Sequence, residues 1–129
     1  MFWMKDKRGI LLVSHVEEIA EGLLQLLQQV AGEVSIRTAG GTEEHGIGTS
    51  FDKITATLEE FEEEKIIAFY DLGSARMNLE MAVEVSEKKV QISRTAFLEG
   101  AYVAASLLQV GVAWEEIEKQ LEPLILEKK

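Results

Sequence analysis

Residues 8–37, RGILLVSHVEEIAEGLLQLLQQVAGEVSIR, contain the pattern from which the fold class follows. It opens on a continuous apolar run at residues 10–13, which is typical of a strand covered on both faces. Apolar residues then recur at helical spacing over residues 16–30, and Gly32 follows as the stop signal of that helix. Alternation over residues 33–37 predicts a second strand. The chain therefore begins with a strand–helix–strand unit.

The rest of the chain continues this alternation of strands and helices. The remaining predicted elements are a glycine-rich loop at 38–50, helices at 51–61, 75–86, 96–109 and 114–125, and strands at 65–70 and 89–92. Strands that alternate with helices predict an α/β fold. We expect a four-stranded parallel sheet of order 2-1-3-4 with helices on both faces, and a single domain over residues 1–129.

Composition restricts the classes of function. The chain has no cysteine, which excludes disulfides, thiolate metal sites and thiol nucleophiles. Thirteen Lys and Arg against 23 Asp and Glu give a net charge of −10, which disfavours nucleic acid and anionic membranes as partners. The basic start around Lys5 precedes an apolar run too short for a signal peptide. We expect a soluble, cytoplasmic protein.

The predicted helix at 96–109 is apolar almost all round. Such a helix is buried on more than one side, and a subunit interface is one natural cover for it. We therefore expect a homodimer. The alternative is that the last helix of the same chain packs over it.

Chemistry-bearing residues follow the first and third predicted strands. In open α/β sheets, ligands bind outside the carboxyl ends of the strands, where Ser14-His15 and the turn 71–74 are expected to lie. His15 also starts a helix, whose free N–H groups and dipole favour a phosphoryl group. Asp71 can accept a hydrogen bond from one ring nitrogen and leave the other as the nucleophile. The alternative is that His15 and Asp71 only cap helices.

The phosphoryl oxygens would be held by Ser74 and by the N–H groups of Gly73 and Ser74. The glycine-rich loop resembles a phosphate-binding loop over residues 46–51, but it lacks the third glycine of the dinucleotide fingerprint and is no Walker motif. Its glycines serve either turns or a close approach of backbone to a ligand. His45, in this loop, is either a surface residue or part of a lid. We expect no metal and no cofactor.

Four motifs taken together carry a family resemblance: VSH at 13–15, GIGT at 46–49, DLGSA at 71–75 and FLEG at 97–100. Their order and spacing resemble the mannose-type enzyme IIA domains of the bacterial phosphoenolpyruvate-dependent phosphotransferase system. Within that superfamily the chain is most similar to the branch formed by the phosphotransfer subunits of dihydroxyacetone kinase. The resemblance extends over residues 9–120.

The resemblance implies a function. Relatives carry a phosphoryl group on the histidine that is His15 here, receive it from the phosphocarrier protein HPr, and pass it to ADP held on the nucleotide-binding subunit of dihydroxyacetone kinase. It implies that Asp71 orients His15 and that the protein is a dimer. The expected phosphoryl-binding residues are Ser14, Gly41, Gly48, Thr49, Gly73 and Ser74.

Three other functions remain open for this fold. The first is an enzyme IIA domain of a mannose-type sugar transporter, although residues 71–76 lack the extra glycine and the proline usual there. The second is a two-component receiver with Asp71 as phosphoacceptor, which would need an acidic pair where Ser14-His15 stands. The third is a non-catalytic dimeric regulator.

Overall fold

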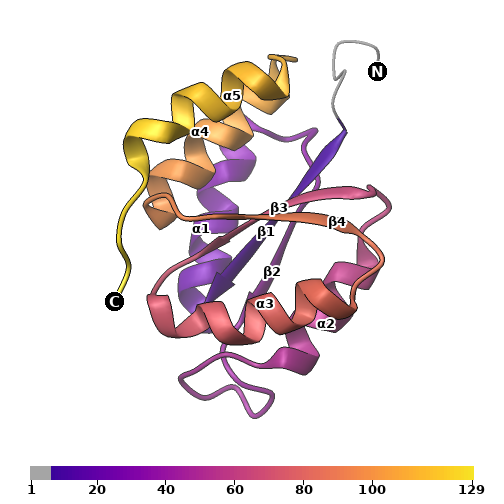
Figure 1. Ribbon diagram of the computed structural model, residues 1–129, viewed down its shortest axis with the longest axis vertical. Helices are drawn as coiled ribbons and strands as arrows, with labels where there is room; N and C mark the ends of the chain where they lie inside the picture. Colours follow the sequence, from indigo (N-terminus) through magenta and orange to yellow (C-terminus); the bar gives the residue numbers. More distant parts are fainter. Residues whose placement is uncertain (1–6) are drawn as a thin grey trace.

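A four-stranded parallel sheet forms the middle layer of the computed structural model, which describes residues 7–129 (Figure 1). The basic start around Lys5 lies outside the described residues. The strands are β1 (Arg8–Ser14), β2 (Ile36–Gly40), β3 (Lys65–Tyr70) and β4 (Lys89–Ser93). Their order is β2-β1-β3-β4, and every neighbouring pair is parallel. The α/β class and the strand order predicted from sequence are confirmed.

Helices cover both faces of this sheet. They are α1 (Glu17–Val30), α2 (Phe51–Glu60), α3 (Arg76–Val85), α4 (Phe97–Gln109) and α5 (Trp114–Leu121), with 3₁₀ turns η1 (Gly73–Ala75) and η2 (Glu122–Leu124). One face packs against α1, α4 and α5, and the opposite face packs against α2 and α3 (Figure 1). The sheet is therefore the shared wall of two apolar clusters.

The first strand anchors both clusters because its side chains alternate between the two faces. Ile10 and Leu12 join the cluster under α1 and α4, whereas Leu11 and Val13 join the one under α2 and α3. All four side chains are completely buried. Burying such a side chain contributes about 1.5–3 kcal/mol. This double burial explains why the strand reads as a continuous apolar run.

The second strand lies further along the chain than its sequence pattern predicts. The predicted strand at 33–37 is wrong, because β2 is Ile36–Gly40 and the loop begins at residue 41. Val34 belongs to the turn after α1, where its N–H donates to the carbonyl of Ala31 while its side chain is buried. Gly40 is the last residue of this strand and is paired with Ser14, and a Cβ there would lie 2.8 Å from the Cα of Glu17. The close start of α1 thus requires a glycine that the sequence pattern assigned to a loop.

The last helix is shorter than predicted and supplies the cover for α4. It ends at Leu121 rather than continuing to Ile125, and Pro123 stands in the 3₁₀ turn that follows. The side of α4 that faces α5 is thereby buried within the chain, while Leu98 and Tyr102 stay exposed. The homodimer stays a prediction. Among residues 7–129, no helix is both long and apolar enough to cross a membrane.

Candidate functional site

His15 and Asp71 meet at the carboxyl ends of the two central strands. Val13 of β1 is paired with Tyr70 of β3, so the residues that follow these strands lie side by side. The Nδ1 atom of His15 is 2.9 Å from Oδ1 of Asp71, and the backbone N–H of His15 donates to Oδ2 at 2.9 Å. The sheet register therefore assembles a histidine–carboxylate pair from residues far apart in sequence.

Asp71 is the most heavily hydrogen-bonded side chain of this pair. Besides the two contacts of His15, the hydroxyl of Ser14 donates to it at 2.9 Å and the N–H of Leu72 at 2.7 Å. Burial raises the pKa of the carboxyl, but these hydrogen bonds outweigh burial and hold the pKa below its usual range. The ionised carboxylate keeps a proton on Nδ1 of His15, which leaves the lone pair on Nε2.

The second ring nitrogen, Nε2, faces the start of a helix. Nε2 of His15 lies 2.7 Å from the hydroxyl oxygen of Ser74, which belongs to the turn η1 that leads into α3. The hydroxyl of Ser74 and the positive end of the dipole of α3 thus lie beside Nε2, an arrangement that favours a dianionic group.

The other predicted phosphoryl-binding residues support the site from behind or from the side. Ser14 is fully buried and faces Asp71. The N–H of Gly41 donates to the carbonyl of Ser14 at 3.0 Å, and that of Gly48 to the carbonyl of His15 at 2.8 Å. Gly41 and Gly48 have φ values of 73° and 138°, which favour glycine. Both glycines therefore fix the loop against the turn that carries His15.

Thr49 and Gly73 also have partners within the chain. The hydroxyl oxygen of Thr49 accepts a hydrogen bond from the amide of Asn78 at 2.9 Å. The N–H of Gly73 donates to the backbone carbonyl of Lys129 at 2.7 Å. Of the predicted phosphoryl-binding residues, Ser74 alone directs a side-chain oxygen at His15.

His45 belongs to a separate network in the glycine-rich loop. Its Nδ1 lies 2.5 Å from Oε2 of Glu17, which also pairs with the ammonium of Lys53 at 3.2 Å. Lys53 in turn donates to the carbonyl of Gly40 at 2.6 Å. Hydrogen bonds from His45 and Lys53 lower the pKa of Glu17. Over residues 7–129, no group of three or more His, Cys, Asp or Glu side chains is placed to hold a metal ion.

Three residues of these networks were missed from the sequence. Asn78 lies one helical turn after Ser74, and this i, i+4 spacing places the two on one face. Lys53 lies in the first turn of α2, where a cation opposes the helix dipole, and that unfavourable position could have indicated a partner. The third is Lys128, whose ammonium donates to the carbonyl of Tyr70 beside Asp71, and its sequence context carries no signal.

The fold and this site have the features of a phosphotransfer protein that uses a histidine. Comparison with protein families agrees, because the model described as PTS system fructose IIA component matches residues 9–118. The chain belongs to this enzyme IIA family.

Named relatives extend over almost the whole chain. It is 45% identical over 120 residues to the PTS-dependent dihydroxyacetone kinase phosphotransferase subunit DhaM of Lactococcus lactis, covering 93% of this chain and 98% of the relative. It is 40% identical over 121 residues to the phosphoryl donor subunit DhaM of PEP-dependent dihydroxyacetone kinase 1 of Listeria innocua, with 94% and 98% covered.

A solved structure also matches. The crystal structure of the protein of unknown function EF1359 superimposes with a TM-score of 0.83 at 27% identity, covering 95% of this chain and 98% of that one. The resemblance to enzyme IIA and to the dihydroxyacetone kinase subunits that the sequence motifs suggested is confirmed.

Proposed function

We propose that this protein is the phosphoryl donor subunit of a dihydroxyacetone kinase and carries the phosphoryl group on Nε2 of His15. The observation that carries the proposal is the orientation of one imidazole, with Nδ1 held by Asp71 and Nε2 open toward Ser74. Relatives named as DhaM over nearly the full chain length support the choice of branch. HPr is the proposed donor, and the nucleotide-binding kinase subunit with its ADP is the proposed acceptor.

In the first step the lone pair of Nε2 attacks the phosphorus of the donor phosphohistidine. The new N–P bond forms as the donor N–P bond breaks, and that electron pair returns to the donor imidazole. Because Nδ1 keeps its proton, the ring of His15 becomes positively charged, and the carboxylate of Asp71 stabilises this charge. Such transfers depend on positioning and electrostatics more than on covalent chemistry by the protein.

In the second step a β-phosphate oxygen of ADP attacks the same phosphorus. The N–P bond of His15 breaks, and its electron pair returns to the ring, which is then neutral with its proton still on Nδ1. Ser74 donates its hydroxyl to a phosphoryl oxygen between the two steps, since this hydroxyl lies beside Nε2. No bond to a metal is needed to hold the group on the ring.

The test is phosphoryl transfer with purified components. The protein is incubated with phosphoenolpyruvate, enzyme I and HPr, and followed by intact mass and acid lability. We expect one acid-labile phosphate on the wild type and on His45→Ala, and none on His15→Ala. The acceptor is then tested by adding the nucleotide-binding subunit with ADP and measuring loss of phosphate from the carrier.

Each alternative function gives a different result. Transfer from HPr but not to the kinase subunit would favour a sugar-transport enzyme IIA. An acid-stable phosphate would favour the two-component receiver, with the phosphoryl group on Asp71. Its persistence in His15→Ala would exclude a phosphohistidine. A folded wild type that takes up no phosphate would favour the dimeric regulator.

Two further features belong to this proposal. Because HPr and the kinase subunits are the proposed partners, we place the protein in the cytoplasm. We also propose association of two copies through the exposed apolar side chains of α4, Leu98 and Tyr102. Analytical ultracentrifugation tests the dimer, and a monomer at micromolar concentration would exclude it.

A further inference from the structure

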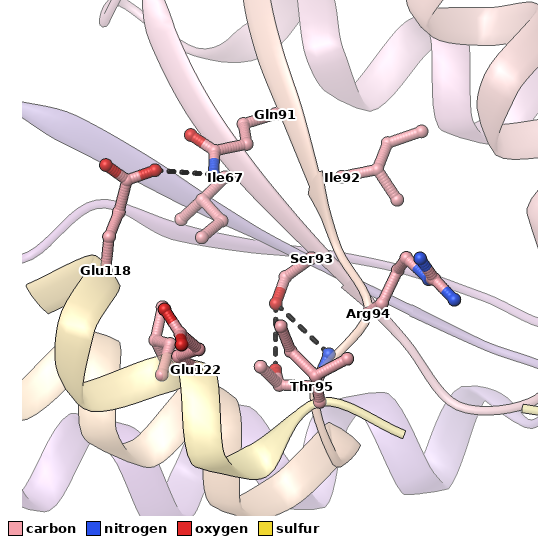
Figure 2. Close-up of a pocket in the computed structure, with 10 residues that line it drawn as sticks. Ile67, Gln91, Ile92, Ser93, Arg94, Thr95, Glu118 and Glu122 are labelled. Carbon is pink, nitrogen blue, oxygen red and sulfur yellow. Dashed lines mark hydrogen bonds between the residues drawn. The ribbon is translucent and has the colours of Figure 1, made fainter. Parts of the chain in front are cut away.

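The segment after the last helical turn, residues 125–129, is fixed by backbone pairing at its beginning. The N–H of Ala96 donates to the carbonyl of Leu124 at 2.9 Å, and the N–H of Leu126 donates to the carbonyl of Arg94 at 2.9 Å. These bonds form an antiparallel bridge between Thr95 and Ile125. Figure 2 shows the chain after α5 passing Thr95. Residues of β4 and α5 line a pocket of about 280 Å³ beside it.

From this bridge the segment runs to the start of α3, where the site lies (Figure 1). The carbonyl of Lys129 accepts the N–H of Gly73, and the ammonium of Lys128 donates to the carbonyl of Tyr70. The same ammonium lies 4.0 Å from the centre of the Tyr70 ring. The segment therefore contacts residues on both sides of Asp71, the residue that holds His15.

The close fit at Gly73 indicates that the segment is a built part of the site. A Cβ at this position would lie 2.6 Å from the carbonyl oxygen of Lys128, so any other residue would push the segment away. Lys128 is partly buried, although its neighbours Glu127 and Lys129 are exposed. Lysine often buries its aliphatic stem, but here the ammonium itself is turned toward the protein, to the carbonyl and the ring of Tyr70.

Charge explains why a cation is useful here. Burial lowers the pKa of Lys128 to about 8, and the carboxylate of Asp71 opposes this by favouring the ammonium. Further charged or titratable groups around Tyr70 and Asp71 are Arg76 of α3, which interacts with Tyr70 and is paired with Glu80, and His15, which is bonded to Asp71. A phosphoryl group on His15 would bring two more negative charges beside Asp71.

We propose that residues 125–129 form part of the phosphoryl-transfer site and that Lys128 is a positioning residue, whose ammonium balances the charge of Asp71 and of the phosphoryl group on His15. This inference rests on the proposed function. Lys128 acts through its positive charge on Asp71 and on the phosphoryl group, since its ammonium is bonded to the carbonyl of Tyr70 and not to His15. Loss of the Lys128 charge should slow phosphorylation of His15 but should not abolish it.

The experiment compares Lys128→Met, Lys128→Arg and the charge-matched control Lys119→Met, which alters an exposed residue of α5. Initial rates of phosphorylation by phospho-HPr are measured from pH 6.5 to 9.5, after circular dichroism has established that each variant is folded. At pH 7 we expect Lys128→Met to be about three- to ten-fold slower than wild type. Lys128→Arg restores most of the rate, and Lys119→Met equals wild type.

The pH profile separates a charge effect from a packing effect. Because wild-type Lys128 loses its proton around pH 8, the wild-type rate should fall toward that of Lys128→Met above this pH, while Lys128→Arg keeps its rate. In addition, NMR titration of the Lys128 side chain should give a higher pKa once His15 is phosphorylated, since coupling between two sites is reciprocal.

Three outcomes would overturn the proposal. They are a rate for Lys128→Met equal to wild type across the pH range, a faster rate, which would make the segment an obstruction, and a loss that Lys128→Arg does not restore. A wild type that accepts no phosphate contradicts the proposed function instead. In that case the NMR titration of unphosphorylated wild type and Asp71→Asn still tests whether the ammonium lies beside Asp71, because the pKa of Lys128 should be lower in the variant, and equal values would contradict that position.

Discussion

The two histidines of this protein are each paired through Nδ1 with a carboxylate, yet they lie in opposite surroundings. His15 and Asp71 expose 17% and 14% of their side chains, and Asp71 is held by four donors at the ends of two central strands. His45 exposes 77%, and its partner Glu17 is shared with Lys53. His45 also has a φ of 65° in an exposed loop. The same pair of groups thus occurs once at the ends of two buried strands and once in an exposed loop.

The difference teaches that the pairing alone does not make a reactive histidine. At His15, the carboxylate of Asp71 holds the ring proton on Nδ1. The other nitrogen, Nε2, faces the hydroxyl of Ser74 at the start of a helix. Around His45, water and a neighbouring ammonium compete for the same carboxylate. The predictions below test whether this contrast determines phosphoryl transfer.

The largest expected effect is that of Asp71→Asn compared with Glu17→Gln. An amide in place of Asp71 can donate to Nδ1 and move the ring proton to Nε2, which removes the nucleophilic lone pair. We expect Asp71→Asn to slow phosphorylation by about 100-fold or more and Glu17→Gln by less than about two-fold. Initial rates with phospho-HPr measure both, and equal losses would abolish the contrast.

The stability of the same variants should differ with pH. Because hydrogen bonds lower the folded-state pKa of Asp71, its stabilisation is fully present above the ordinary value of 3.8 and is lost as pH falls through the lower folded value. At pH 7 we expect Asp71→Asn to lower the free energy of unfolding by about 1–2 kcal/mol. Urea unfolding from pH 7 to pH 3 should show this difference narrowing. A constant difference would mean that the charge of Asp71 is not involved.

A smaller effect is expected at Ser74. Ser74→Ala removes the hydroxyl beside Nε2 but keeps the start of the helix that follows it. We expect about a three- to ten-fold lower rate. Ser106→Ala is the matched control, because that hydroxyl bonds only to carbonyls of its own helix, those of Tyr102 and Val103. A rate for Ser74→Ala equal to that of the control would remove Ser74 from the transfer machinery.

The smallest effect is expected for His45→Ala. The side chain is mostly exposed, and the loop keeps the bonds of Gly41 and Gly48 to the turn around His15. We expect less than about a two-fold change in rate, measured with phospho-HPr at pH 7. A loss above ten-fold would instead make His45 part of a lid over the site.

The central strands and the pair they carry could be predicted from the sequence. β1 and β3 are apolar runs because both of their faces are buried. Parallel strands end at one edge of the sheet, so His15 and Asp71 could be predicted to lie close together. The bounds of β2 were predicted wrongly because Gly40 was assigned to the loop, whereas this glycine is needed where the start of α1 comes close to the strand. The position of Lys128 depends on the backbone bridge between Ile125 and Thr95, and this bridge leaves no pattern in the sequence.

The register of β1 against β3 also has a consequence for folding. Val13 and Tyr70 pair across a chain segment that contains two helices and the strand β2, so the contact between His15 and Asp71 is a non-local one. Closing a loop of that length is paid in chain entropy, and non-local pairings of this kind slow the folding of parallel sheets. The histidine can therefore acquire its neighbour only in a chain whose central strands have already found each other. Acceptance of a phosphoryl group would then report on completed folding, and could time that event in a refolding experiment.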